Sequence, residues 1–129
     1  AYLTVRDEDK DALVPVAREL ESMGFAIYAT PGTADVIRAN GIDVQTVYRI
    51  NDRQHPDALD LMRKGQVSFI VNVPTISGGA VRDGNMMRRL AVEMNIPFVT
   101  TMSGAVMEVA AIKANREVDL VPMRLTVNY

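Results

Sequence analysis

The sequence predicts an α/β fold in which a central, mainly parallel five-stranded sheet lies between two layers of helices. Apolar residues alternate along the chain between short β-rich runs and the three- or four-residue spacing of helices. The most regular run, residues 67–73, is almost continuously apolar, as is typical of a strand buried on both faces of a parallel sheet. With 129 residues, of which 48% are hydrophobic, the chain has the size of one domain.

Each expected strand is a short apolar or β-branched run bounded by turn residues. In chain order, the strands are expected at residues 1–5, 25–29, 44–48, 67–73 and 97–101. Helices are expected between and after them, at residues 13–23, 31–40, 56–64, 86–94 and from 103 onward. Thr30 is a good N-cap for the second helix, and Pro31 suits its first turn. A polar loop is expected at residues 49–55, and a loop rich in glycine at residues 74–82.

Composition excludes several function classes. The chain has no cysteine, which rules out a disulfide scaffold, a thiolate zinc site and a cysteine nucleophile, and its single histidine provides no His cluster for a transition metal. A net charge of -2 and 5% aromatic residues do not suit a nucleic-acid-binding surface. No apolar run is long enough to span a membrane and no secretion signal is recognisable, so we expect a cytoplasmic protein without nucleic-acid or membrane partners.

The two ends predict how the chain is organised. Residues 1–5 begin directly as a strand, so we interpret the sequence as a piece of a longer protein. Residues 1–115 are expected to form the domain. Residues 116–129 are expected to be a C-terminal extension, either an edge strand or a connection to further chain.

Polar residues suited to binding an anion follow the expected strands. Ligands of open parallel α/β sheets bind outside the carboxyl ends of the strands. The residues at those ends are Lys10, Thr30 to Thr33, Arg49, Asn72, Thr100-Thr101 and Ser103-Gly104. They offer cations, hydroxyls and an amide, so the sequence predicts a phosphate-binding site at this edge.

The segment Thr30-Pro31-Gly32-Thr33 is the most specific of these. At a helix N-terminus it offers free backbone N–H groups, two hydroxyls and the positive end of the helix dipole, and Gly32 lets an oxygen approach the backbone. The alternative is that Thr30 only caps the helix and Gly32 only makes a turn.

The other three candidates also have a structural interpretation. Lys10 and Arg49 taken alone are more often solvated. Asn72 follows a buried apolar run, so its amide either braces a loop or contacts a ligand, because an unpaired buried amide is costly.

Several motifs resemble one family. They are Thr-Val-Arg-Asp-Glu-Asp-Lys (4–10), Gly-Phe to Thr-Pro-Gly-Thr-Ala (24–34), Asn-Gly-Ile (40–42), Asn72, Arg-Asp-Gly with Met-Arg-Arg (82–89) and Ile-Pro with Thr-Thr (96–101). In this order and spacing they resemble the methylglyoxal-synthase-like (MGS-like) domain at the carboxyl end of the large chain of carbamoyl-phosphate synthase. The similarity spans about residues 2–115 and implies a three-layer α/β/α, Rossmann-like fold.

The resemblance implies a regulatory, non-catalytic domain of this ATP-dependent ligase, which serves pyrimidine and arginine biosynthesis. Such domains bind an allosteric effector, UMP or IMP in many bacterial forms and N-acetylglutamate in some mitochondrial ones. The implied contacts fall on Lys10, Thr30, Gly32, Thr33, Arg49, Asn72 and Ser77. No cofactor is expected here, since ATP and metal ions would bind the synthetase domains. The implied partners are the other domains of the large chain and the glutaminase small chain. Association of several copies into an oligomer is left open.

Residues 73–79 depart from the family pattern, which leaves the effector open. Three other functions are weighed. A methylglyoxal synthase-like lyase acting on dihydroxyacetone phosphate shares the phosphate-binding turn, but residues 74–84 contain no histidine to serve as an acid partner for Asp52. The cyclohydrolase domain of purine synthesis carries a Lys-Thr-Leu-His-Pro-type segment that this chain lacks. A structural or oligomerisation module remains the last alternative.

Overall fold

Five parallel strands form one sheet in the order β3-β2-β1-β4-β5 in the computed structural model of the chain, which describes residues 1–75 and 78–120. The strands are β1 (Tyr2–Val5), β2 (Tyr28–Ala29), β3 (Gln45–Thr46), β4 (Ile70–Val73) and β5 (Phe98–Val99). Every pairing is parallel. The predicted α/β fold with a parallel five-stranded sheet is therefore confirmed.

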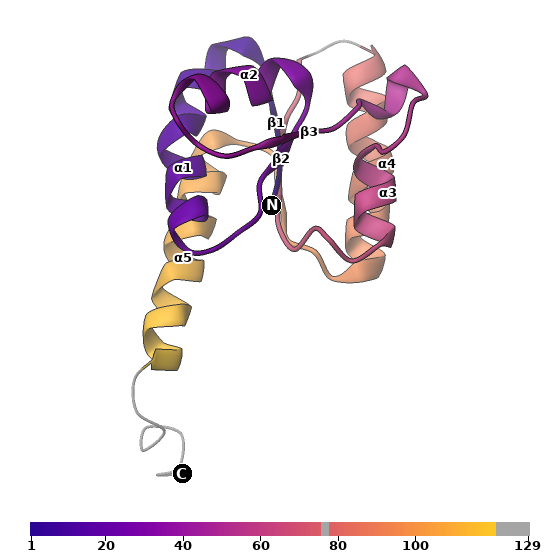
Figure 1. Cartoon of the computed structure of the whole chain (residues 1–129). Coiled ribbons are helices and arrows are strands. Elements are labelled where there is room, and N and C mark those ends of the chain that lie inside the picture. The colour runs from indigo at the N-terminus through magenta and orange to yellow at the C-terminus, as the bar shows by residue number, and fades with distance from the viewer. Residues whose placement is uncertain (76–77, 121–129) are drawn as a thin grey trace.

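Helices cover both faces of the sheet (Figure 1). They are α1 (Lys10–Ser22), α2 (Pro31–Ala39), α3 (Ala58–Arg63), α4 (Gly78–Met94) and α5 (Met102–Leu120), with short 3-10 turns η1 (Asp7–Asp9) and η2 (Ile50–Asp52). Figure 1 shows α1, α2 and α5 on one side and α3 and α4 on the other. The result is the three-layer α/β/α arrangement that the sequence predicts.

The strands divide the core into two clusters because their side chains alternate between the faces. Leu3 and Val71 pack on the α1, α2 and α5 side, with helix residues such as Leu13 and Ile37. Tyr2 and Ile70 pack on the opposite side, where residues of α3 and α4 complete the cluster. All the strand residues named here are nearly or fully buried, so this alternation fixes which faces the helices cover.

The strand order places the expected binding edge. From β1 the chain moves outward to β2 and β3, and then returns to add β4 on the other side of β1. Connections leave β1 and β4 in opposite directions, which opens a crevice beyond their carboxyl ends where ligands of such sheets bind. These ends are Val5 and Val73, which are paired in register.

Several element boundaries differ from the sequence prediction. The helix expected from Pro56 begins at Ala58, because the Asp57 carboxylate accepts a hydrogen bond from the Asp60 N–H at 3.0 Å and caps it. The glycine-rich loop expected at 74–82 is shorter, since α4 already begins at Gly78. Glycines in a first turn are tolerated because the N–H groups there have no helical acceptor.

The C-terminal boundary also moves. Helix α5 continues through Leu120, so the extension expected from residue 116 begins inside a helix, and residues 121–129 lie outside the described part of the chain. Within residues 1–75 and 78–120, no helix combines the length and apolar character needed to cross a bilayer.

Candidate functional site

A cavity of about 430 Å³ lies beyond the carboxyl ends of β1 and β4. This end of the sheet carries η1, the start of α2 and the approach to α4, at the top of Figure 1. Six of the seven predicted site residues line the cavity, namely Lys10, Thr30, Gly32, Thr33, Arg49 and Asn72. The seventh, Ser77, lies outside the described residues. One cavity therefore collects side chains from four separate connections.

Three threonines join the end of β1 to the start of α2. The Thr30 and Thr4 hydroxyls are 2.9 Å apart. The Thr33 hydroxyl accepts the Val5 N–H at 3.2 Å and lies 3.4 Å from the Val5 carbonyl, to which it donates. The β1–β2 pairing ends at Ala29, so the Val5 N–H has no strand carbonyl to bond to on this side. The Thr33 hydroxyl serves as its acceptor. The wall is therefore held by internal hydrogen bonds before any ligand arrives.

Thr30 occupies the N-cap position of α2, but its hydroxyl makes no capping hydrogen bond. The predicted N-cap position is confirmed, but the hydroxyl pairs with Thr4 and does not cap the helix. The first-turn N–H groups of Gly32 and Thr33 have no acceptor within the helix. Together with the helix dipole they make this end of the cavity attractive to an anion.

Lys10 lies across the start of α2. It is the first residue of α1, only 17% of its side chain is exposed, and its Nζ lies 3.5 Å from the place where a Cβ on Gly32 would stand. The ammonium donates to the Asp7 carboxylate. The prediction that Lys10 faces the site agrees with this geometry, whereas a purely solvated lysine does not.

Arg49 lines the cavity from the segment between β3 and η2. It precedes η2, its backbone N–H donates to Asp52, and within the described part of the chain its guanidinium has no hydrogen bond or ion pair. Arg6 also lines the cavity, but its charge is already paired with Asp9 at 2.6 Å and Glu8 at 3.4 Å. Arg49 is thus the cation with most freedom to meet a ligand.

Asn72 forms the floor of the cavity on β4. It is 5% exposed, and no residue within 1–75 and 78–120 makes a hydrogen bond to its amide. Its Nδ2 lies 2.6 Å from the place where a Cβ on Gly84 would stand, so α4 can pack here only because Gly84 lacks a side chain. A buried amide without a protein partner that faces a cavity is suited to a ligand.

Asp83 and Asn51 are lining residues that the sequence analysis missed. The Asp83 carboxylate accepts the Asn51 N–H at 3.1 Å, which ties α4 to η2. Partial burial raises the pKa of Asp83, and the Asp52 charge raises it further, against the opposing effects of the Asn51 N–H and Arg82. The Arg-Asp-Gly motif at 82–84 was recognisable, but the helix was expected to begin only at residue 86. The direction of the Asp83 side chain could therefore not be predicted.

Other candidates lie elsewhere. Thr101 caps α5 by accepting the Gly104 N–H at 3.0 Å. The residues predicted at the end of the fifth strand are not among those that line the cavity. His55 is 73% exposed and its ring contacts Asp60 at 2.5 Å. With Asp57 these two form the sole metal-compatible group among the residues that the structure describes, but its carboxylates already serve the cap of α3. Neither group joins the anion site.

The arrangement suits binding of a phosphate-sized anion. Three cationic residues line the cavity (Arg6, Lys10 and Arg49) against two acids (Asp7 and Asp83). Hydrogen bonds to charged groups contribute about 1.5–3 kcal/mol each. The backbone N–H groups, Lys10 and Arg49 can each supply such a bond to a phosphate oxygen.

Comparison with known proteins agrees with this geometry. The family model described as the MGS-like domain matches residues 12–100, which include most of the cavity-lining segments. The chain belongs to the MGS-like domain family. This assignment confirms the family predicted from the motifs and the fold that it implies.

The relatives of this MGS-like domain are large chains of carbamoyl phosphate synthase. It is 45% identical over 114 residues to the C-terminal section of the large chain from Methanocaldococcus jannaschii, covering 88% of this chain and 18% of that protein. Identity is 39% over 117 residues with the corresponding section from Methanopyrus kandleri, covering 91% and 21%. It is 39% over 102 residues with the large chain from Thermoplasma volcanium, covering 79% and 10%. The chain therefore spans about a fifth or less of these relatives.

Proposed function

We propose that this MGS-like domain is the regulatory domain of a carbamoyl phosphate synthase large chain and binds a phosphate-bearing effector. The Asn72 amide carries the proposal, because it makes no hydrogen bond within the described residues and shares one cavity with Lys10 and the first-turn N–H groups of α2. No fully enclosed side-chain polar atom of the described residues lacks a partner, so this amide opens into the cavity, where a ligand can reach it. The names of the relatives support the same assignment.

Each wall of the cavity has a proposed role. The N–H groups of Gly32 and Thr33 hold the phosphate, and Lys10 and Arg49 neutralise it. The Thr30 and Thr33 hydroxyls, which are bonded to Thr4 and Val5, hold the start of α2 in place behind it. Asn72 orients the sugar or carboxylate part of the effector, and Ser77 contributes from the loop after β4. UMP and IMP are the phosphate-bearing effectors to test, and N-acetylglutamate tests whether the site takes a dicarboxylate instead.

Regulation requires the rest of the enzyme. An effector can shift the synthase only through different affinities for two of its states. We infer that the other domains of the large chain and a glutaminase small chain are the partners, and that ATP and metal ions bind there. The domain itself is proposed to be non-catalytic and cytoplasmic, and to adjust carbamoyl phosphate supply for pyrimidine and arginine synthesis.

Isothermal titration calorimetry tests this proposal. UMP, IMP and N-acetylglutamate are titrated in turn into the chain, and at least one is expected to bind with a dissociation constant in the micromolar range. Lys10→Gln is expected to weaken that binding, because it removes the most enclosed cation of the cavity. No heat from any of the three at millimolar concentration would favour the structural or oligomerisation module.

One observation favours a second candidate, a methylglyoxal synthase-like lyase. Asp83 lines the anion cavity with a raised pKa, as a carboxylate that exchanges protons with a substrate would. Against it, His55 does not line the cavity, so no imidazole is present there to act as the acid partner of Asp83. Incubation with dihydroxyacetone phosphate separates the candidates, since catalysed release of methylglyoxal supports the lyase and overturns the regulatory domain.

A further inference from the structure

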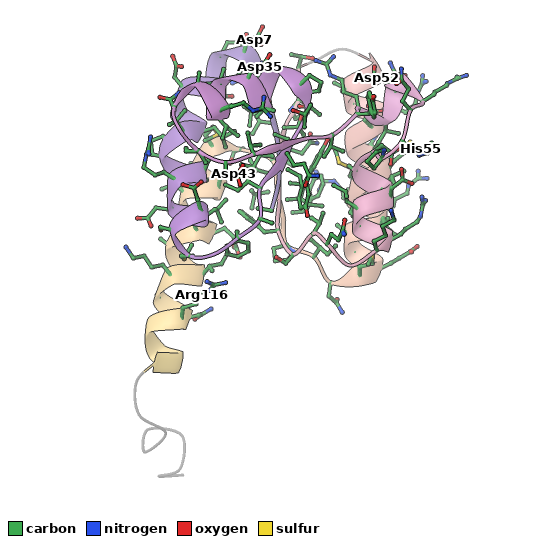
Figure 2. All side chains as sticks on the ribbon, viewed as in Figure 1. Asp7, Asp35, Asp43, Asp52, His55 and Arg116 are labelled. Atoms are coloured by element: carbon green, nitrogen blue, oxygen red, sulfur yellow. The ribbon has the colours of Figure 1, made fainter. Side chains whose placement is uncertain are left out.

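The Lys10 ammonium already has an anionic partner inside the proposed site. The Asp7 carboxylate accepts a hydrogen bond from Lys10 Nζ, and both residues line the cavity. Asp7 comes from η1, at the upper end of the molecule where Figure 2 labels it. A phosphate that binds Lys10 must therefore compete with this carboxylate.

The surroundings of Asp7 are those of a bound anion. The hydrogen bond from Lys10 and then the Lys10 charge hold the pKa of Asp7 below its ordinary value, and the Arg49 charge adds to this. Lys10 and Arg49 are the same two cations that are proposed to neutralise the phosphate. Asp7 therefore lies in the combined field of both.

The two partners differ in how firmly they are held. The Lys10 side chain is 17% exposed, whereas the Asp7 side chain is 89% exposed. An exposed carboxylate can leave an ion pair at small cost, because such pairs are weak in water. Of the two side chains, only Lys10 is largely enclosed by the cavity.

We propose that Asp7 is an internal competitor that occupies Lys10 in the empty site and is displaced by the phosphate of the effector, so that it sets the affinity of the site. The inference rests on the proposed function and names a regulatory element within it. A competing carboxylate weakens the binding of every anion that must displace it by the same factor, which is set by the fraction of molecules in which Lys10 is free.

The same turn offers a matched control. Glu8 is also an acid of η1, is 69% exposed and pairs with Arg6 at 3.4 Å, not with Lys10. Glu8→Gln and Asp7→Asn remove the same charge from neighbouring positions at the N-terminus of α1. Any effect of net charge or of the helix dipole appears in both variants, whereas displacement of a competitor appears only in Asp7→Asn.

The experiment measures dissociation constants of UMP and of inorganic phosphate for the wild-type chain, Asp7→Asn, Glu8→Gln, Lys10→Gln and the double variant Asp7→Asn/Lys10→Gln. Asp7→Asn is expected to bind both probes about two- to fivefold more tightly, the range expected for removing one exposed ion pair. Glu8→Gln is expected to match the wild type. In the Lys10→Gln background, Asp7→Asn is expected to have no effect.

The outcomes separate the two proposals. If the wild type binds a probe and Asp7→Asn binds it equally or more weakly, the proposal that Asp7 competes is overturned. The proposed effector site is not affected by that result. An equal gain in Glu8→Gln, or a gain that persists without Lys10, also overturns the competitor, because the effect is then general repulsion. If none of the five proteins binds either probe, the competitor fails, whereas the proposed function fails only if IMP and N-acetylglutamate also give no heat.

Discussion

The two walls of the cavity differ in how their polar side chains are hydrogen-bonded. On the β1–α2 wall, the hydroxyls of Thr4, Thr30 and Thr33 are bonded to one another or to the β1 backbone. On the β4–α4 wall, Asn72 has no partner in the part of the chain that the structure describes, and it fits only because Gly84 has no side chain. Both walls belong to the same site, and Thr30, Thr33 and Asn72 are all buried.

This contrast indicates which wall maintains the fold and which is available to a ligand. Removing a group that is bonded within the protein leaves its partner unsatisfied, which costs about 1–3 kcal/mol when the partner is buried. Replacing a group that has no partner costs stability little. Substitutions in the first wall are therefore expected to act on folding, and those in the second on binding.

Thr33→Ala is expected to have the largest effect, on stability. It removes the acceptor of the Val5 N–H, which is buried at the end of β1, and should lower the free energy of unfolding by about 1–3 kcal/mol. Urea denaturation followed by circular dichroism measures this change. Thr33→Ser keeps the oxygen and is the matched control, expected to lose less than half as much. Equal losses in the two variants would show that the methyl group, not the hydrogen bond, holds this wall.

Asn72→Leu is expected to separate binding from stability. Leucine has a similar volume and no polar atoms, so the buried amide disappears without leaving any partner unsatisfied. UMP binding should weaken about two- to tenfold, the equivalent of one lost hydrogen bond to the uncharged sugar. The free energy of unfolding should remain the same or rise, as measured by urea denaturation. A variant that unfolds more easily than Thr33→Ala would contradict the contrast between the walls.

Much of the fold was predictable because it depends on local patterns. The apolar run that ends in β4 and the glycines after α1, α2 and α3 each reflect a local rule of strand burial or helix termination. Gly24, Gly41 and Gly65 all have positive φ values, as expected of residues that end helices. The sheet order depends on packing between distant segments, and a local pattern does not encode it.

The site was predictable to the extent that strand ends converge. Lys10, Thr33 and Asn72 share a cavity because the carboxyl ends of β1, β2 and β4 lie side by side. The pairing of Thr30 with Thr4 was not predictable, since it depends on β2 stopping at Ala29 beside β1. Asp83 was missed because α4 begins earlier than the glycine-rich sequence indicated.

Gly84→Ala is expected to disturb the open wall by a smaller amount. The new Cβ would lie 2.6 Å from Asn72 Nδ2, so the amide must turn away from its place in the cavity. UMP binding should weaken about two- to fivefold. Stability should change by less than about 1 kcal/mol, because alanine is the better helix former and the displaced atom ends a flexible side chain.

Gly79→Ala is the matched control for Gly84→Ala, since its Cβ would meet Asn51 at 3.2 Å and not Asn72. Both variants place a methyl group on α4. Equal loss of UMP affinity in the two would indicate a general change of the helix and would remove Gly84 as the residue that positions Asn72.

The smallest expected effect is a pH dependence at Asp83, on the same wall. Because folding raises the pKa of this carboxyl above its ordinary value of 3.8, the folded chain favours the protonated form. Its contribution to stability is complete below pH 3.8 and is lost as the pH rises through the folded-state pKa. Asp83→Asn, which can still accept the Asn51 N–H, should match the stability of the wild type near pH 3 and be more stable at pH 7 by less than about 1 kcal/mol.

Thermal unfolding across this range measures the difference, and Asp43→Asn, at an exposed residue between α2 and β3, is the control. A variant that is less stable than the wild type at pH 7 would mean that the ionised carboxylate supports this wall through its bond to η2, and the β4–α4 side would then be as internally bonded as the threonine side.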